Sequence, residues 1–219
     1  MVSKKPLSLS AFDLDHTLLS TNCSYRFGCY LCKKRILSFS SLAFIIGCHI
    51  RHTAGYLPID KLHESAFNRL FLGRSSSLVS QWADDFLNEN FDGMLYQPTI
   101  DRLKLAQEAG HLTIILSSAP DFLVKPIAKR LNVDLWNATC YRVDKDQKFC
   151  QIDKLLLGDG KAVIMDELMQ KYQISKQQTY AYSDSYLDLL FLEAAGIACG
   201  VNPDRKLSRI CRENNWQII

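Results

Sequence analysis

The stretch AFDLDHTLLS, residues 11–20, places two aspartates one residue apart directly after an apolar run. We expect residues 7–14 to form a short buried strand that ends at these carboxylates. Two carboxylates this close disfavour each other's ionisation unless a positive charge lies nearby. Asp13 and Asp15 therefore predict a site that holds a cation, and the rest of the chain must supply its other groups.

Strand and helix patterns alternate after residue 96. Continuous apolar runs predict strands at 112–116, 179–182 and 197–201, and short strands surround a turn at 144–146. Helical spacing and Gly stops predict helices over residues 96–110, 122–131, 161–172 and 187–195. This alternation favours an α/β fold, a Rossmann-like doubly wound parallel sheet with helices on both faces.

The stretch between the first two strands has a different pattern. Residues 21–95 contain few strand signals, and Leu78, Trp82 and Phe86 recur at helical spacing. We expect residues 1–20 and 96–219 to form the α/β core. Residues 21–95 are expected to form an inserted α-helical cap over one edge of the sheet.

Three predicted strands end in polar side chains: Asp13 and Asp15, then Ser117 and Ser118, then Asp184. Ligands of open α/β sheets bind beyond the carboxyl ends of the strands, so these groups should converge. Three carboxylates in one place need a cation, and Mg²⁺ prefers oxygen ligands while leaving room for a phosphate oxygen.

Two further residues fit such a site. Asp188 follows Asp184 by one helical turn, so it can act as a metal ligand or support one. Lys161, in GDGK at a loop-to-helix junction, offers a point charge for a phosphate. With the hydroxyl donors of Ser117 and Ser118, these groups are typical of phosphoryl transfer.

The motifs DLDHT (13–17), ILSS (115–118), the lysine of GDGK (158–161) and YSDSYLD (182–188) resemble the four motifs of the haloacid dehalogenase superfamily of phosphohydrolases. They occur in the order of that superfamily and cover residues 9–201. The helical insert is similar to the cap of the phosphoserine phosphatase-like branch.

The resemblance implies a role for each residue. Asp13 would be the nucleophile that forms an aspartyl-phosphate, and Asp15 the general acid and then the base. The Asp13 side chain, the Asp15 backbone carbonyl and Asp184 would hold Mg²⁺, with Asp188 in support. The phosphoryl group would bind to Ser117, Ser118 and Lys161. A proton donor requires a raised pKa at Asp15, and a second carboxylate two residues away is one way to raise it.

The sequence departs from this pattern in places. His16 stands where Gly is commoner, and we expect it to face solvent or the cap rather than to catalyse. In phosphoserine enzymes an acidic residue and an arginine of the cap bind the amino acid. Here Asn22, Ser24 and Arg26 follow the first motif without an acidic partner, which argues against serine phosphate.

Each motif also has a purely structural interpretation. Asp13 and Asp15 could cap a helix, and Ser117–Ser118 could form a simple turn. Asp184 and Asp188 could be solvated charges at a helix start. For Lys161, the alternative is a solvent-facing side chain, with Lys154 taking its place in the site.

The bulk composition excludes several classes. A net charge of +3 without a long basic run argues against nucleic acid, and acidic small molecules remain suitable partners. No secretory signal is evident, so we expect the eight cysteines to be reduced in a cytoplasmic protein. Cys29 and Cys32 form a CxxC, but a zinc site would need further ligands.

Residues 36–50, ILSFSSLAFIIGCHI, are apolar between two basic flanks. The run is shorter than the ~20 residues needed to span a bilayer. It is either a buried helix or one that contacts a membrane surface or an apolar substrate. The leading hypothesis is a Mg²⁺-dependent phosphomonoesterase acting on a small molecule. The alternatives are a phosphatidylglycerophosphate-type lipid phosphatase and a non-catalytic phosphate-binding protein.

Overall fold

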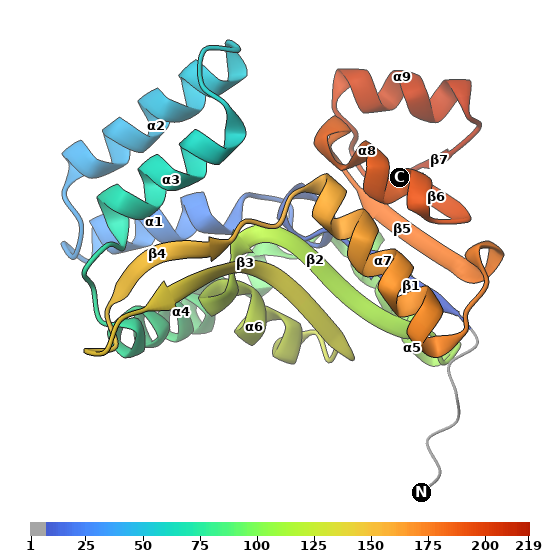
Figure 1. Ribbon diagram of the computed structural model, residues 1–219, viewed down its shortest axis with the longest axis horizontal. Helices are drawn as coiled ribbons and strands as arrows, with labels where there is room; N and C mark the ends of the chain where they lie inside the picture. Colours follow the sequence, from blue (N-terminus) through green and yellow to red (C-terminus); the bar gives the residue numbers. More distant parts are fainter. Residues whose placement is uncertain (1–7) are drawn as a thin grey trace, which may run out of the picture.

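A computed structural model describes residues 8–219. Its centre is a seven-stranded sheet in the order β4-β3-β2-β1-β5-β6-β7 (Figure 1). The strands are β1 (Leu9–Phe12), β2 (Leu112–Pro120), β3 (Leu135–Val143), β4 (Phe149–Lys154), β5 (Thr179–Ser183), β6 (Ile197–Gly200) and β7 (Gln217–Ile218). Only β4 runs antiparallel to its neighbour. The predicted α/β class with a parallel sheet is confirmed.

Nine α-helices surround the sheet in the described part of the chain. They are α1 (Cys23–Lys33), α2 (Phe39–Thr53), α3 (Ile59–Leu70), α4 (Ser76–Asn90), α5 (Gln97–Glu108), α6 (Asp121–Arg130), α7 (Gly158–Tyr172), α8 (Leu189–Ala194) and α9 (Arg205–Glu213). The first four lie between β1 and β2, where the sequence predicted a helical insert.

The sheet is buried on both faces because successive side chains of a strand point to opposite sides. On β1, Leu9 and Ala11 pack with apolar side chains of α7, α8 and α9. Phe12, one residue on, belongs to the opposite core, which includes α5, α6 and parts of the insert. The central strands therefore read as continuous apolar runs, and their ends are left as the places for polar groups.

Two predicted strand boundaries differ from the structure. β1 covers four residues instead of eight: Leu7 lies outside the described residues, and the chain turns after Phe12. β2 is longer than expected and reaches Pro120, because pairing with β3 continues past a register shift between Ser117 and Pro120. Ser117 and Ser118 therefore lie inside the strand.

The insert is joined to the rest of the molecule by aromatic packing. Phe27 of α1 and Phe71, just after α3, both contact Phe122 of α6, at ring-centre distances of 5.9 and 5.2 Å. The chain between α3 and α4 also pairs with the β3–β4 hairpin, since the Gly73 amide donates to the Phe149 carbonyl. Helices α2 and α3 rise side by side away from the sheet (Figure 1). The insert thus has a fixed base and a projecting tip.

Candidate active site

Asp13 is the first residue after β1. Its backbone amide donates to the Tyr182 carbonyl of β5 at 2.9 Å, which continues the pairing of the two strands by one residue. The residue is 6% exposed, and its Oδ1 accepts a hydrogen bond from the Lys161 Nζ at 2.6 Å. The aspartate therefore sits at the end of a rigid central strand with one oxygen fixed.

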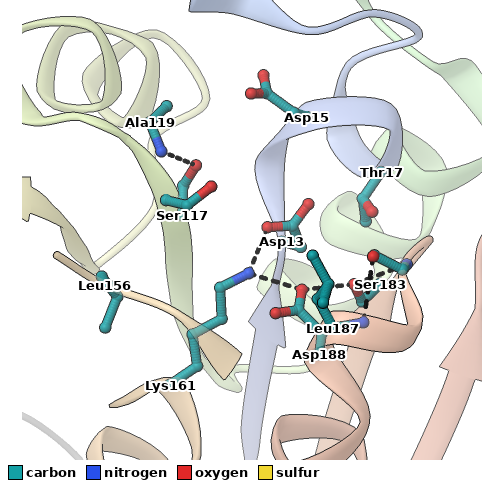
Figure 2. A network of polar contacts seen from close by, with 12 residues as sticks. Asp13, Asp15, Thr17, Ser117, Ala119, Leu156, Lys161, Ser183, Leu187 and Asp188 are labelled. Atoms are coloured by element: carbon teal, nitrogen blue, oxygen red, sulfur yellow. Dashed lines mark hydrogen bonds and ion pairs between the residues drawn. The ribbon is translucent and has the colours of Figure 1, made fainter. Parts of the chain in front are cut away.

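Lys161 lies in the first turn of α7 and is 2% exposed. Its ammonium also donates to Asp188 Oδ2 at 2.6 Å, so it bridges two carboxylates (Figure 2). Gly158 makes this placement possible, because a Cβ there would lie 2.1 Å from the Leu187 carbonyl oxygen. The start of α7 can thus pack directly against the turn that carries Asp188. Lys154, the alternative lysine, is exposed.

Asp188 is the last residue of a short 3-10 turn, Tyr186–Asp188, that leads into α8. Its Oδ2 accepts from Ser183 Oγ at 2.7 Å as well as from Lys161. This oxygen thus accepts two hydrogen bonds, one of them from the lysine. Asp188 thus contacts Lys161 directly, and its role as a metal ligand or as a support for one stays a prediction.

The charges of this network are strongly coupled. Burial alone would lower the pKa of the Lys161 ammonium, but the two carboxylates outweigh it and raise that pKa above its usual value. Burial raises the pKa of the Asp13 carboxyl well above its usual range, against the pull of Lys161. Asp188 and Asp184 add to the rise, because like charges disfavour each other. Three carboxylates, those of Asp13, Asp184 and Asp188, therefore share this pocket with one lysine.

Asp184 follows β5 directly and faces the loop after β1. Thr17 Oγ1 donates to its Oδ1 at 3.5 Å, and burial raises the pKa of Asp184 to about 6 although the nearby His16 opposes the rise. The structure thus places Asp184 beside Asp13 at the same sheet edge, as the order of the strands requires.

Asp15 points toward the insert. Its Oδ1 accepts from the Cys23 amide at 2.8 Å, and its Oδ2 from the Asn22 side chain at 2.9 Å. The helix-capping interpretation is thus partly correct, because this carboxylate satisfies the first amide of α1. Burial is the main reason why the pKa of Asp15 is raised, and the Cys23 hydrogen bonds oppose it. The raised pKa is as expected, but Asp13 is not among its main causes, because Asp15 turns away from that neighbour (Figure 2).

His16 stands where Gly is commoner in the first motif, and its backbone has the conformation that a glycine would adopt there. Its φ is +59°, in the left-handed region that glycine adopts most easily. The side chain is exposed at the cavity between the sheet edge and the insert, as expected. This histidine keeps the tight turn and places an imidazole ring near Asp15 and Asp184.

Ser117 and Ser118 lie on the opposite wall of the site. Ser117 is buried, and its Oγ accepts from the Ala119 amide at 3.1 Å, within the part of β2 where the register to β3 shifts. Its side chain and those of Asp13 and Lys161 face the same space (Figure 2). Ser118 is half-buried at the cavity wall, and its carbonyl accepts from Thr139 Oγ1 at 2.7 Å.

A cavity of about 680 Å³ opens from Asp15 and Ser118 into the insert. We call it the insert cavity. Its walls are mainly apolar side chains of α1, α2 and α3, with His49, His52 and His63 among them. The sequence pointed to Asn22 only in connection with serine phosphate, and it did not place His52 or His63 at the site. The signals available in the sequence were His49 and His52, three residues apart on an apolar helix, and Asn22, a helix-capping residue type after the first motif.

The donors at the sheet edge fit a hard dication. Asp13 and Asp184 are carboxylates with a surplus of negative charge, which oxygen-preferring Mg²⁺ would neutralise. Within residues 8–219, no three His, Cys, Asp or Glu side chains gather to hold a metal by themselves. The resemblance implies a ligand set of the Asp13 side chain, the Asp15 backbone carbonyl and Asp184, with Asp188 in support, and that set stays a prediction.

The chain is similar to several known proteins. A probable phosphatase of Mycobacterium tuberculosis is 25% identical over 214 residues, 95% of this chain and 73% of that protein. A phosphoserine phosphatase of the same organism is 24% identical over 222 residues, 97% of this chain and 71% of the relative. A Bordetella pertussis protein of unknown function has the same fold, with a TM-score of 0.85, 23% identity and 98% of each chain covered.

A family model of haloacid dehalogenase-like hydrolases matches residues 11–193, from the first aspartate motif to α8. This span is most of the chain and contains every residue of the sheet-edge network. The protein is therefore an enzyme that belongs to the haloacid dehalogenase-like hydrolase family.

Proposed function

We propose that this protein is a Mg²⁺-dependent phosphatase that hydrolyses a phosphomonoester through an aspartyl-phosphate on Asp13. The observation that carries the proposal is the buried contact of 2.6 Å between Lys161 Nζ and Asp13 Oδ1 at the end of β1. Among the described residues, the hydrogen bonds to this carboxylate fall on Oδ1. Oδ2 is then the oxygen that can attack phosphorus. Relatives named as phosphatases support the reaction class.

In the first step, an Asp13 oxygen forms a bond to phosphorus while the bond from phosphorus to the ester oxygen breaks. Asp15 gives its proton to the leaving oxygen, which departs as an alcohol. The raised pKa of Asp15 favours the protonated form that this step needs, and burial is its source. Asp15 lines the insert cavity, so the leaving group would lie there.

In the second step, water attacks the phosphorus of the aspartyl-phosphate. Asp15, now a carboxylate, accepts a proton from this water, and the bond between phosphorus and Asp13 breaks. Inorganic phosphate and the original carboxylate are the products. One residue thus serves as acid and then as base because it stands between the nucleophile and the cavity.

The remaining residues hold the phosphoryl group and the ion. Asp13, the carbonyl of Asp15 and Asp184 would hold Mg²⁺, which when bound stabilises charge on the phosphoryl oxygens. Lys161 would hold the phosphoryl oxygens from the core side, and Ser117 and Ser118 would donate from β2. Asp188 keeps Lys161 charged and in place.

We further propose that residues 21–95 act as a cap that covers the site. The support is that α1, α2 and α3 supply most of the walls of the insert cavity, while residues 8–20 and 96–219 supply the sheet edge. We also propose a cytoplasmic location, because all eight cysteines are free and the cytoplasm keeps thiols reduced.

Turnover of an aryl phosphate tests the main proposal. With Mg²⁺, the purified protein should hydrolyse p-nitrophenyl phosphate, and a chelator should abolish this. Asp13→Asn should remove turnover while the circular dichroism spectrum is retained. Asp166→Asn, on the exposed face of α7, is the matched control and should stay active. Full activity of Asp13→Asn would contradict the proposal. A protein inert toward a broad phosphate panel would favour the non-catalytic alternative.

A second candidate is a lipid phosphatase that works at a membrane surface. Helix α2 exposes large apolar side chains, among them Phe39 at 78% and Ile50 at 60%, next to Arg51. Within residues 8–219, every helix is too short or too polar to cross a bilayer, so contact would be at the surface. Co-sedimentation with anionic vesicles that is lost in Phe39→Ser/Ile50→Ser would favour this candidate, and equal recovery in the supernatant would count against it.

A further inference from the structure

The insert cavity differs from the sheet edge in having almost no charged side chain. Among its lining residues in the described part of the chain, Asp15 is the only one that is Asp, Glu, Lys or Arg. Asp15 is already hydrogen-bonded to Asn22 and the Cys23 amide. Arg26, the arginine nearest to the first motif, is exposed and lies outside the lining. A charged leaving group would therefore find no counter-charge.

The walls are instead suited to apolar atoms. Leu42 and Ile45 of α2 face the cavity, as do Leu62 and Leu70 of α3 and Phe71 after it. A volume of about 680 Å³ is in the range of sites that take a whole organic molecule. A small amino alcohol such as serine would leave most of this space unfilled. Apolar surface buried here would contribute to binding in proportion to its area.

Two of the histidines, His52 and His63, add hydrogen-bonding capacity. His52 Nδ1 lies 2.8 Å from the Leu57 carbonyl, so that nitrogen carries a proton and its orientation is set. Burial lowers the pKa of His63 to about 4, and the neighbouring His52 adds to this, so His63 is neutral at physiological pH. The ring belongs to the lining and can pair with a hydroxyl or carbonyl of a ligand.

We infer that the insert cavity selects phosphomonoesters whose leaving group is uncharged and largely apolar, such as a long alkyl or aryl alcohol. This inference rests on the proposed function, because it assigns the space beyond Asp15 to the leaving group. The reason is a difference in desolvation. An apolar group gains from leaving water, whereas an ammonium or carboxylate without a partner loses.

Three synthetic esters with the full-length protein and Mg²⁺ test the inference: ethyl phosphate, hexyl phosphate and 6-aminohexyl phosphate. Release of inorganic phosphate gives kcat/KM for each. Hexyl phosphate should exceed ethyl phosphate by at least about tenfold, because four more methylenes are buried. The terminal ammonium of 6-aminohexyl phosphate should lower kcat/KM by about tenfold or more relative to hexyl phosphate.

A pair of variants on α2 makes the test specific to the cavity. Ile46 lines the cavity, whereas Ile50 lies one turn later, 60% exposed and outside the lining. Ile46→Glu should raise the ratio of 6-aminohexyl to hexyl turnover by about tenfold, because it supplies a counter-charge. Ile50→Glu should leave this ratio unchanged.

The possible outcomes distinguish a failure of the inference from a failure of the proposed function. Hydrolysis that depends on Asp13 but shows no preference for hexyl over ethyl phosphate, or prefers the ammonium ester, would overturn the inference alone. Equal responses of Ile46→Glu and Ile50→Glu would also overturn it. If Asp13→Asn matched the wild type on all three esters, the proposed function would fail and the inference with it.

Discussion

The sheet edge and the insert cavity meet at Asp15 but are built on opposite principles. At the edge, a buried lysine holds two carboxylates at 2.6 Å each, and a further aspartate stands close by. In the cavity, apolar side chains and neutral histidine surround a space of about 680 Å³. The sheet edge carries the charged groups that the proposed reaction uses. The insert cavity has almost no charged side chain, and we infer that this property selects the substrate. The proposed reaction and its proposed specificity therefore depend on separate parts of this chain.

Removal of the group between the two regions should have the largest effect. Asp15→Asn keeps an oxygen that can accept from the Cys23 amide, so the fold should be retained. It loses proton transfer, which should lower kcat by about 10²–10⁴-fold for an alkyl phosphate. The loss should be smaller for p-nitrophenyl phosphate, whose leaving group needs less protonation. Steady-state kinetics with both esters measure this, and an equal loss for the two would count against Asp15 as the acid.

A change at the charged edge should be visible in stability. Lys161→Met leaves Asp13 and Asp188 buried without their partner, so the free energy of unfolding should fall by about 3–5 kcal/mol. Lys154→Met, at an exposed position on β4, is the control and should change it by less than about 0.5 kcal/mol. Urea unfolding of both variants measures these two changes in the free energy of unfolding. Equal midpoints would mean that the buried network contributes no net stability.

The near absence of charge in the insert cavity predicts a smaller effect. It should be seen in how the free energy of unfolding depends on pH. His63 titrates at about 4 in the folded protein, against 6.5 ordinarily, because burial and His52 disfavour its cation. Below pH 6.5 the unfolded chain binds more protons, so stability should fall as the pH drops from 6.5 to 4, by up to about 3 kcal/mol. His63→Gln lacks this titration. The wild-type curve minus the variant curve should show the slope, and parallel curves would show that His63 is not buried as a neutral ring.

The same contrast explains how far the sequence could predict the molecule. The sheet, the helical insert and the meeting of Asp13 with Asp184 followed from apolar runs that end in polar residues, since parallel strands bring their carboxyl ends to one edge. The direction in which Asp15 points did not follow, because it depends on where α1 begins relative to the strand end. The cavity could not be predicted either. Its walls come from α1, α2 and α3, and their packing depends on contacts such as Phe71 with Phe122 that are distant in sequence.

The central claim is that Asp13 becomes covalently phosphorylated, and a direct chemical trap tests it most closely. The protein is mixed with hexyl phosphate and Mg²⁺, quenched in acid within one turnover and analysed by peptide mass spectrometry. The account predicts the added mass of one phosphoryl group on the peptide that contains Asp13, with none in Asp13→Asn. Phosphate released during a full turnover without any labelled peptide, or label on another residue, would contradict it.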